Sequence, residues 1–146
     1  MVFVLVRSPM MNKEWQRLCP EEDGEGFIYI TKTQQGRWYI GKKSYHRRSK
    51  KKIVGASDWK KYYGSSKKLK EDIKGGMDYE RFIVFEGCSK SELSYVETKL
   101  QLHFDASIRD DSYNSMLNFR LNTVKTKANH AECYGNAVLI LEKIIY

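Results

Sequence analysis

The sequence has little of what stabilises secreted proteins or anchors membrane proteins. It holds only three cysteines in 146 residues, and their odd number and wide spacing exclude a disulfide framework. The longest wholly apolar run, residues 1–6, is far too short to span a bilayer, and no positive charge precedes it as in a secretory signal. We therefore expect a protein of the reducing cytoplasm.

Sequence motifs for common cofactors are also missing. The chain contains no Walker-type or dinucleotide-binding glycine loop. His130 and Cys133 form one HxxC pair, but a zinc site needs four ligands and the other cysteines have no paired spacing. Cys88 has no histidine partner that the sequence identifies, so a thiolate nucleophile is not indicated.

Positive charge is what the sequence has in excess, and it is concentrated in one segment. The chain carries 26 lysines and arginines against 18 acidic residues, a net charge of +8. Residues 42–74 account for +10 and the remainder for −2. Such a segment can be a solvated face, but Trp59, Tyr62 and Tyr63 lie among the cations, a mixture that suits base stacking beside phosphate neutralisation. This favours nucleic acid over an anionic membrane surface as the partner.

The length suits a single domain, because 146 residues are enough for one core and too few for two full-sized ones. An apolar content of 41% supports a globular fold. We expect a short strand at residues 2–6 and a short helix at residues 12–19 that ends near Pro20. The predicted division is an N-terminal extension at 1–25, a core at 26–114 and a C-terminal extension at 115–146.

A β-hairpin is predicted for residues 27–31 and 37–42, two aromatic and β-branched runs separated by Gln-Gln-Gly. A three-residue loop with its glycine in the left-handed conformation would place Tyr29 opposite Gly41, on the same face as Tyr39. A two-residue loop would put the tyrosines on opposite faces, and we predict the three-residue loop. The other face then carries the core side chains Ile28, Ile30, Trp38 and Ile40.

Downstream of the hairpin, the pattern predicts helices and a third strand. In chain order the expected elements are an irregular basic segment at 43–57, a helical turn at 58–63, a helix from Ser65 or Ser66 to Lys74, a strand at 80–86, and the longest helix, from a capping box at Ser89 to Phe104. The fold class is therefore α+β, with a small three-stranded antiparallel sheet flanked by helices.

Glu97 falls at the edge of an apolar stripe on the last of these helices. The stripe consists of Leu93, Val96, Leu100 and Phe104 at helical spacing. Glu97 could be an ordinary boundary glutamate that reaches outward. A carboxylate that is partly removed from water instead needs a cation or hydrogen-bond donors to hold it.

These elements carry a recognisable set of motifs. Residues 26–29 read GFIY, residues 39–41 read YIG, Glu97 follows on a helix, and residues 112–114 read SYN. In this order and spacing they resemble the GIY-YIG nuclease family, although the first motif contains one inserted residue. The stretches YIGKKSY, DWKKYYGSSKKL and SKSELSYVETKLQ further resemble the Seg-type freestanding homing endonucleases of tailed phages.

The resemblance implies roles for the motif residues. Tyr29 would help to activate the attacking water and Tyr39 would orient the phosphate. A phenol is a poor base at neutral pH, so the neighbouring Lys42 and Lys43 would favour its phenolate. The helical glutamate, Glu97, would ligate one divalent ion, Mg²⁺ or Mn²⁺. Gly41 would allow close approach of backbone and substrate, and Asn114 would support the site.

The family's phosphate-binding arginine is harder to place, because its usual spacing falls near Ser49. Arg47 is our preferred candidate over Arg48, and His46 beside them is either a proton-transfer group or a surface histidine. Trp59 could stack on a base or pack at the edge of the core. The residues expected to bind DNA are Lys42, Arg48, Lys50, Lys51, Lys52, Trp59, Lys60, Lys61, Ser65, Ser66 and Lys67.

The implied function is a divalent-metal-dependent endonuclease that hydrolyses phosphodiester bonds of double-stranded DNA by a one-metal mechanism, in the cytoplasm of a phage-infected bacterium. A noncatalytic nucleic-acid-binding module on the same scaffold is the alternative. A structural or inhibitory phage protein that binds another protein is the third interpretation. The first two share a steep salt dependence of DNA binding, and metal-dependent product formation separates them. The oligomeric state stays open.

Overall fold

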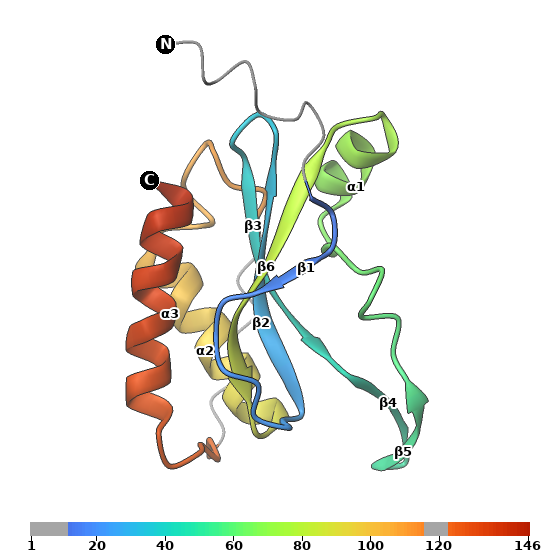
Figure 1. Cartoon of the computed structure of the whole chain (residues 1–146), viewed down its shortest axis with the longest axis vertical. Coiled ribbons are helices and arrows are strands. Elements are labelled where there is room, and N and C mark those ends of the chain that lie inside the picture. The colour runs from blue at the N-terminus through green and yellow to red at the C-terminus, as the bar shows by residue number, and fades with distance from the viewer. Residues whose placement is uncertain (1–11, 116–122) are drawn as a thin grey trace.

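A four-stranded sheet lies at the centre of the structure, a computed structural model that describes residues 12–115 and 123–146 (Figure 1). The strand order is β1-β6-β2-β3, in which β2 pairs antiparallel with β3 and β6, and β1 runs parallel to β6. The strands of this sheet are β1 (Trp15–Arg17), β2 (Gly26–Thr33), β3 (Trp38–Ser44) and β6 (Tyr79–Gly87). The strand predicted for residues 2–6 lies outside the described residues.

The β2–β3 hairpin has the predicted register. The Thr33 N–H donates to the Arg37 carbonyl across 2.8 Å and so closes a three-residue loop, residues 34–36, in which Gly36 adopts a φ of +85°. Tyr29 pairs with Gly41 as expected. The predicted core side chains of this hairpin are fully buried; they are Ile28, Ile30, Trp38 and Ile40.

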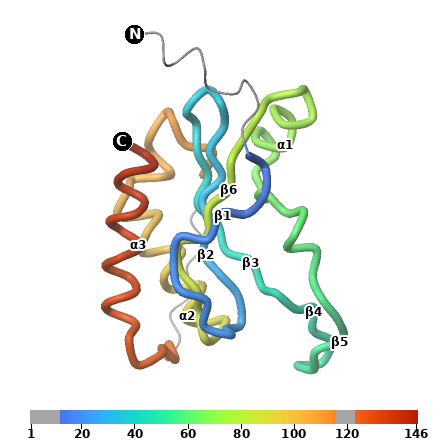
Figure 2. The backbone as a smooth tube through the Cα atoms, in the orientation of Figure 1, coloured from blue at the N-terminus to red at the C-terminus, as the bar shows by residue number. Residues whose placement is uncertain are grey.

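Helices cover one face of the sheet, as Figures 1 and 2 show. They are α2 (Lys90–His103) and α3 (His130–Ile145), and the predicted stripe of α2 packs in the same core as the hairpin. The other face carries an aromatic layer around Phe27 and Tyr29. On that side lie α1 (Lys67–Lys74) and a second, two-stranded sheet of β4 (His46–Ser49) and β5 (Lys52–Ala56).

Local signals correctly located two of the predicted helices, α1 and α2. Ser66 caps α1 by accepting from the Leu69 N–H, and Gly75 ends it. Ser89 caps α2 by accepting from the Glu92 N–H across 3.1 Å. The predicted turn at 58–63 is present as well, since the Lys61 N–H donates to the Asp58 carbonyl. Serine caps are effective because they satisfy backbone donors that no helical carbonyl reaches.

The helix predicted for residues 12–19 is wrong, because residues 15–17 form strand β1 on the edge of β6. The Trp15 ring packs edge-on against Phe27 and Tyr29, at centroid distances of 5.1 and 5.5 Å. Sheet pairing and this aromatic burial outweigh a weak local helix pattern. The sheet therefore has four strands rather than the predicted three.

The irregular segment predicted for residues 43–57 is also wrong. Strand β3 continues to Ser44, and β4 and β5 form a hairpin. Its turn contains Lys50 and Lys51, both with positive φ, rather than the glycine or asparagine that marks such turns. Because lysines occupy the turn, the sequence pattern did not indicate a hairpin.

The longest described helix is α3, with 16 residues, rather than α2, with 14. Ala137, Leu141 and Ile145 of α3 are buried in the core. The division of the chain into extensions and a core stays a prediction, although β1 and α3 both pack on the central sheet. Within the two described ranges, no helix combines the length and apolar character needed to cross a membrane.

Candidate active site

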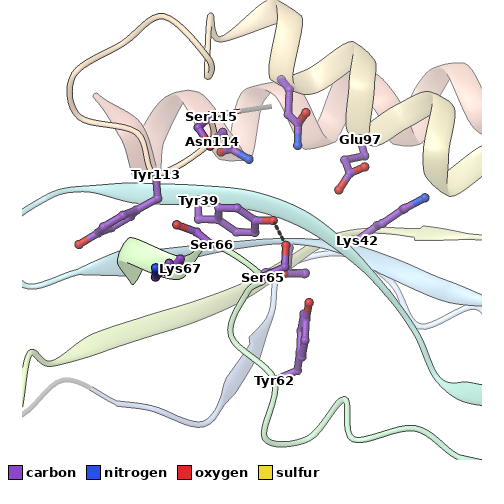
Figure 3. A pocket seen from close by; sticks show the side chains of 12 residues that line it. Tyr39, Lys42, Tyr62, Ser65, Ser66, Lys67, Glu97, Tyr113, Asn114 and Ser115 are labelled. Carbon is purple, nitrogen blue, oxygen red and sulfur yellow. Dashed lines mark hydrogen bonds between the residues drawn. The ribbon is translucent and has the colours of Figure 1, made fainter. Parts of the chain in front are cut away.

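A cavity of about 510 Å³ lies at the edge of β3, between α2 and the loop that precedes α1 (Figure 3). Figure 3 shows the hydroxyls of Tyr39 and Tyr62 and the carboxylate of Glu97 pointing toward the same space. The residues that line it are Tyr29, Tyr39, Lys42, Tyr62, Ser65, Ser66, Lys67, Glu97, Gln101, Tyr113, Asn114 and Ser115. The fold thus collects side chains that are far apart in the sequence.

One buried phenol, Tyr29, and one half-buried phenol, Tyr39, line this cavity. Tyr29 is only 1% exposed, and its burial, with Tyr39, Tyr62 and Glu97 nearby, raises its pKa well above the usual value. Burial also raises the pKa of Tyr39, whose hydroxyl shares a 2.7 Å hydrogen bond with Ser65. Both phenols are therefore neutral at pH 7 and available to hydrogen-bond a ligand.

Glu97 turns into the cavity rather than outward. Burial raises the pKa of this carboxyl, and the charge and backbone N–H of Lys42 oppose the increase. Among the described residues that line the cavity, Glu97 is the single acidic one. A bound cation stabilises a partly desolvated carboxylate of this kind.

Close packing at Gly41 brings the two phenols together. A Cβ atom at this position would lie 2.5 Å from the Tyr29 hydroxyl and 2.9 Å from Tyr39 Cε2. Such contacts are shorter than any that carbon atoms tolerate, so a larger residue would displace one of the rings. The glycine of the second motif is required here by space.

Two amide side chains hold the backbone next to Gly41. Asn114 Oδ1 accepts from the Ile40 N–H across 2.9 Å, and its Nδ2 donates to the Ile40 carbonyl across 2.8 Å. Gln101 Nε2 donates to the same carbonyl across 3.0 Å. The sequence analysis missed Gln101, although its position four residues after Glu97 on α2 was a usable signal.

The predicted site residues Lys43, His46 and Arg47 do not line this cavity. They line a second one of about 490 Å³, which shares Lys42 and Tyr62 with the first. Lys43 forms a 2.7 Å ion pair with Asp58 and lies over the Tyr62 ring, so its charge is paired with Asp58. Lys42 donates to Ser94 and lies near Glu97.

The residues expected to bind DNA are spread over three places. Ser65, Ser66 and Lys67 line the first cavity, whereas Lys60 and Lys61 are exposed on the preceding loop. Arg48 and Lys50–Lys52 belong to the β4–β5 hairpin. The Trp59 ring packs against Phe27 and Tyr45, so it forms part of the aromatic layer.

The cavity suits a hard divalent cation that takes few protein ligands. Within residues 12–115 and 123–146, no group of three or more histidine, cysteine, aspartate or glutamate side chains could enclose a metal. Mg²⁺ commonly keeps several waters and uses one or two carboxylates together with substrate phosphates. Glu97, at the wall of an open polar cavity, fits that pattern.

Comparison with known families identifies the domain. A family model described as "Putative endonuclease segE, GIY-YIG domain" matches residues 10–124, which include every described residue of the first cavity. No curated protein and no solved structure gives a significant match. The matched family is one of nucleases, for which DNA is the substrate. The chain belongs to the SegE-type family of GIY-YIG endonuclease domains.

Proposed function

We propose that this chain hydrolyses phosphodiester bonds of double-stranded DNA with one divalent ion bound at the first cavity. The observation that carries the proposal is the convergence of Tyr29, Tyr39 and Glu97 on one space that is otherwise lined by cations, hydroxyls and amides. Such a site combines one metal ligand with groups that bind a phosphate and a water.

Glu97 would hold the ion, with Mg²⁺ or Mn²⁺ as the natural choice for an oxygen ligand. When bound, the ion supplies charge stabilisation to the phosphate and to the leaving 3′-oxygen. Lys42 favours the ionised form of Glu97, because its charge opposes the rise that burial causes in the pKa of that carboxyl. Lys42 therefore favours the carboxylate form of Glu97, which binds the metal, before the substrate enters.

The phenols and their neighbours would bind and orient the reacting groups. Tyr39 and Ser65 already share a hydrogen bond at the cavity wall and can redirect their hydroxyls to a phosphate oxygen. Tyr29 would hold the attacking water through its hydroxyl oxygen. It accepts a proton only when nearby cations lower its pKa, because burial raises that pKa in the free protein.

Lys43, His46 and Arg47 would bind the phosphates that flank the scissile one, since the second cavity adjoins the first. This assignment replaces direct contact of Arg47 with the scissile phosphate. The likeness to Seg-type enzymes also favours a freestanding homing endonuclease that acts in a phage-infected bacterium. The odd number and wide spacing of the cysteines favour the reducing cytoplasm as its compartment.

The test compares the wild type with Glu97→Gln on supercoiled and linear duplex DNA in Mg²⁺, in Mn²⁺ and in EDTA. We expect metal-dependent nicking or cleavage by the wild type. The variant should bind the same DNA but cut about 10³-fold more slowly, because charge stabilisation by the ion amounts to several kcal/mol.

Glu142→Gln is the matched control, since it removes the same charge from an exposed position on α3. It should cut at the wild-type rate. DNA binding by the wild type without product under any metal condition would instead support the noncatalytic binding module. Equal cleavage by Glu97→Gln would remove Glu97 from the site.

A further inference from the structure

The β4–β5 hairpin is a separate two-stranded ribbon that extends away from the central sheet (Figures 1 and 2). Residues 46–56 contain five lysines and arginines and no acidic residue. Arg48, one residue pair from the turn, forms an ion pair with Glu25 and so holds one strand of the ribbon to the body. In the described chain, Lys50, Lys51 and Lys52 form no ion pair.

The ribbon also exposes two large apolar side chains among these cations. Ile53 is 54% exposed and Val54 is 53% exposed. The pairing shifts so that Arg48 lies opposite Ile53 and Arg47 opposite Gly55, which leaves Val54 as the extra residue of a bulge. A partner that covered both side chains would remove apolar surface from water, which is favourable.

The turn of the ribbon places its lysines at a conformational cost. Lys50 and Lys51 have φ values of +51° and +69°, the left-handed region that Asn-Gly occupies with less strain. Residues in strained conformations of this kind cluster at functional sites. Here it holds two cations at the tip.

We propose that this ribbon enters the major groove of the DNA substrate and reads its sequence. Lys50–Lys52 would contact phosphates along the groove, and Ile53 and Val54 would pack on thymine methyl groups. The major groove, about 12 Å wide, admits a two-stranded ribbon and is where thymine presents its methyl group. The inference rests on the proposed function only in taking DNA as the substrate.

The position and charge of the ribbon favour DNA over other partners. His46 and Arg47 at its base line the second cavity, which adjoins the active site, so a bound duplex can reach both. A second copy of the chain would bring five like charges against five, and lysines on strand edges oppose such pairing. A membrane would require a broader apolar face than two side chains.

The first experiment measures thymine recognition directly. A random duplex pool is enriched by binding to Glu97→Gln, and the selected duplex is then synthesised with thymine or with uracil, which lacks the methyl group. The Glu97→Gln chain, whose ribbon is unchanged, should bind the thymine duplex more tightly than the uracil duplex, by about fourfold for each methyl group contacted. The variant Ile53→Ser/Val54→Ser should bind both duplexes equally.

Leu139→Ser is the control, because Leu139 is 59% exposed on α3, away from the ribbon. It should keep the preference for thymine. Equal binding of the two duplexes by the parent chain, or a preference retained by the ribbon variant, would overturn the proposal. Cleavage by the wild type is measured in parallel, so that loss of thymine recognition with cleavage intact contradicts the ribbon alone.

A second experiment separates the tip charge from folding. Lys50→Asn/Lys51→Gly supplies the residues that this turn prefers, so thermal stability should be equal or higher. The slope of log Kd against log salt should become shallower by about two, as expected for two lost phosphate contacts. Lys143→Asn on α3 should leave the slope unchanged. An unchanged slope for the tip variant would exclude the lysines from the interface.

Discussion

Gly41 controls how closely the two cavity tyrosines approach each other. The substitution Gly41→Ala would place a methyl group 2.5 Å from the Tyr29 hydroxyl, so we expect cleavage to slow by roughly 10²-fold through displacement of the phenols. Gly135→Ala on α3 meets no atom within 4 Å and should raise the free energy of unfolding by about 0.4–1 kcal/mol. Single-turnover cleavage and urea unfolding test both, and a fully active Gly41→Ala enzyme would contradict this packing.

Lys42 influences the pKa of Glu97. Burial raises the pKa of Glu97 and Lys42 opposes that rise, so Lys42→Met should raise this pKa further. Because the metal binds the ionised carboxylate, the acid limb of the cleavage rate against pH should then move to higher pH. Lys67→Met removes a charge from the same cavity and should leave the limb in place. An unmoved limb in Lys42→Met would exclude this coupling.

Asn114 acts on strand β3 as a substitute for a neighbouring strand. Its amide oxygen accepts from the Ile40 N–H and its amide nitrogen donates to the Ile40 carbonyl, between Tyr39 and Gly41. Asn114→Ala should destabilise the fold by about 1–3 kcal/mol, because it leaves the Ile40 N–H unpaired while Gln101 still bonds the Ile40 carbonyl, and it should slow cleavage. Asn136→Ala, at an exposed position on α3, should do neither. Urea unfolding gives the stability, and unchanged stability in Asn114→Ala would contradict this role.

Elements with strong local signals were predicted correctly. The alternation of Ile28, Tyr29 and Ile30 between the two sheet faces, together with a glycine-containing loop, specified the β2–β3 register. Serine caps specified the starts of two helices. Strand β1 was not predictable in this way, because three residues become a strand only when β6 offers an edge. The β4–β5 turn lacked glycine and asparagine, so its hairpin signal was hidden.

Two buried carboxylates connect distant parts of the whole molecule. Glu86, whose side chain is 1% exposed, binds Arg17, Tyr45 and the backbone N–H groups of Glu22 and Gly24. Glu92 binds the Cys88 N–H and His130, and so joins α2 to the start of α3. Burial alone would raise the pKa of Glu86, but these hydrogen bonds and the Arg17 charge lower it overall.

Stability should therefore fall in acid. A carboxyl whose pKa is lower in the folded state contributes stability above its unfolded pKa, about 4.3, and that contribution is lost as pH falls through the folded value. Glu86→Gln should cost about 3–5 kcal/mol at neutral pH and less at pH 3, which lies below the unfolded pKa. Urea unfolding at both pH values tests this, with exposed Glu142→Gln as control. A penalty independent of pH would contradict the assignment.

The order of residues along the chain was enough to establish the paired tyrosines on one strand face, the glutamate beside a helical apolar stripe and the concentration of positive charge. These follow from the periods of strands and helices and from composition, which are local properties. Tertiary packing alone placed α2 at the edge of β3, where Glu97 faces Tyr29 and Tyr39 and where Gln101 and Asn114 hold Ile40. It also turned Lys43 toward Asp58, because a side chain's partner depends on which segments the fold brings within a few ångströms, and no local pattern records that.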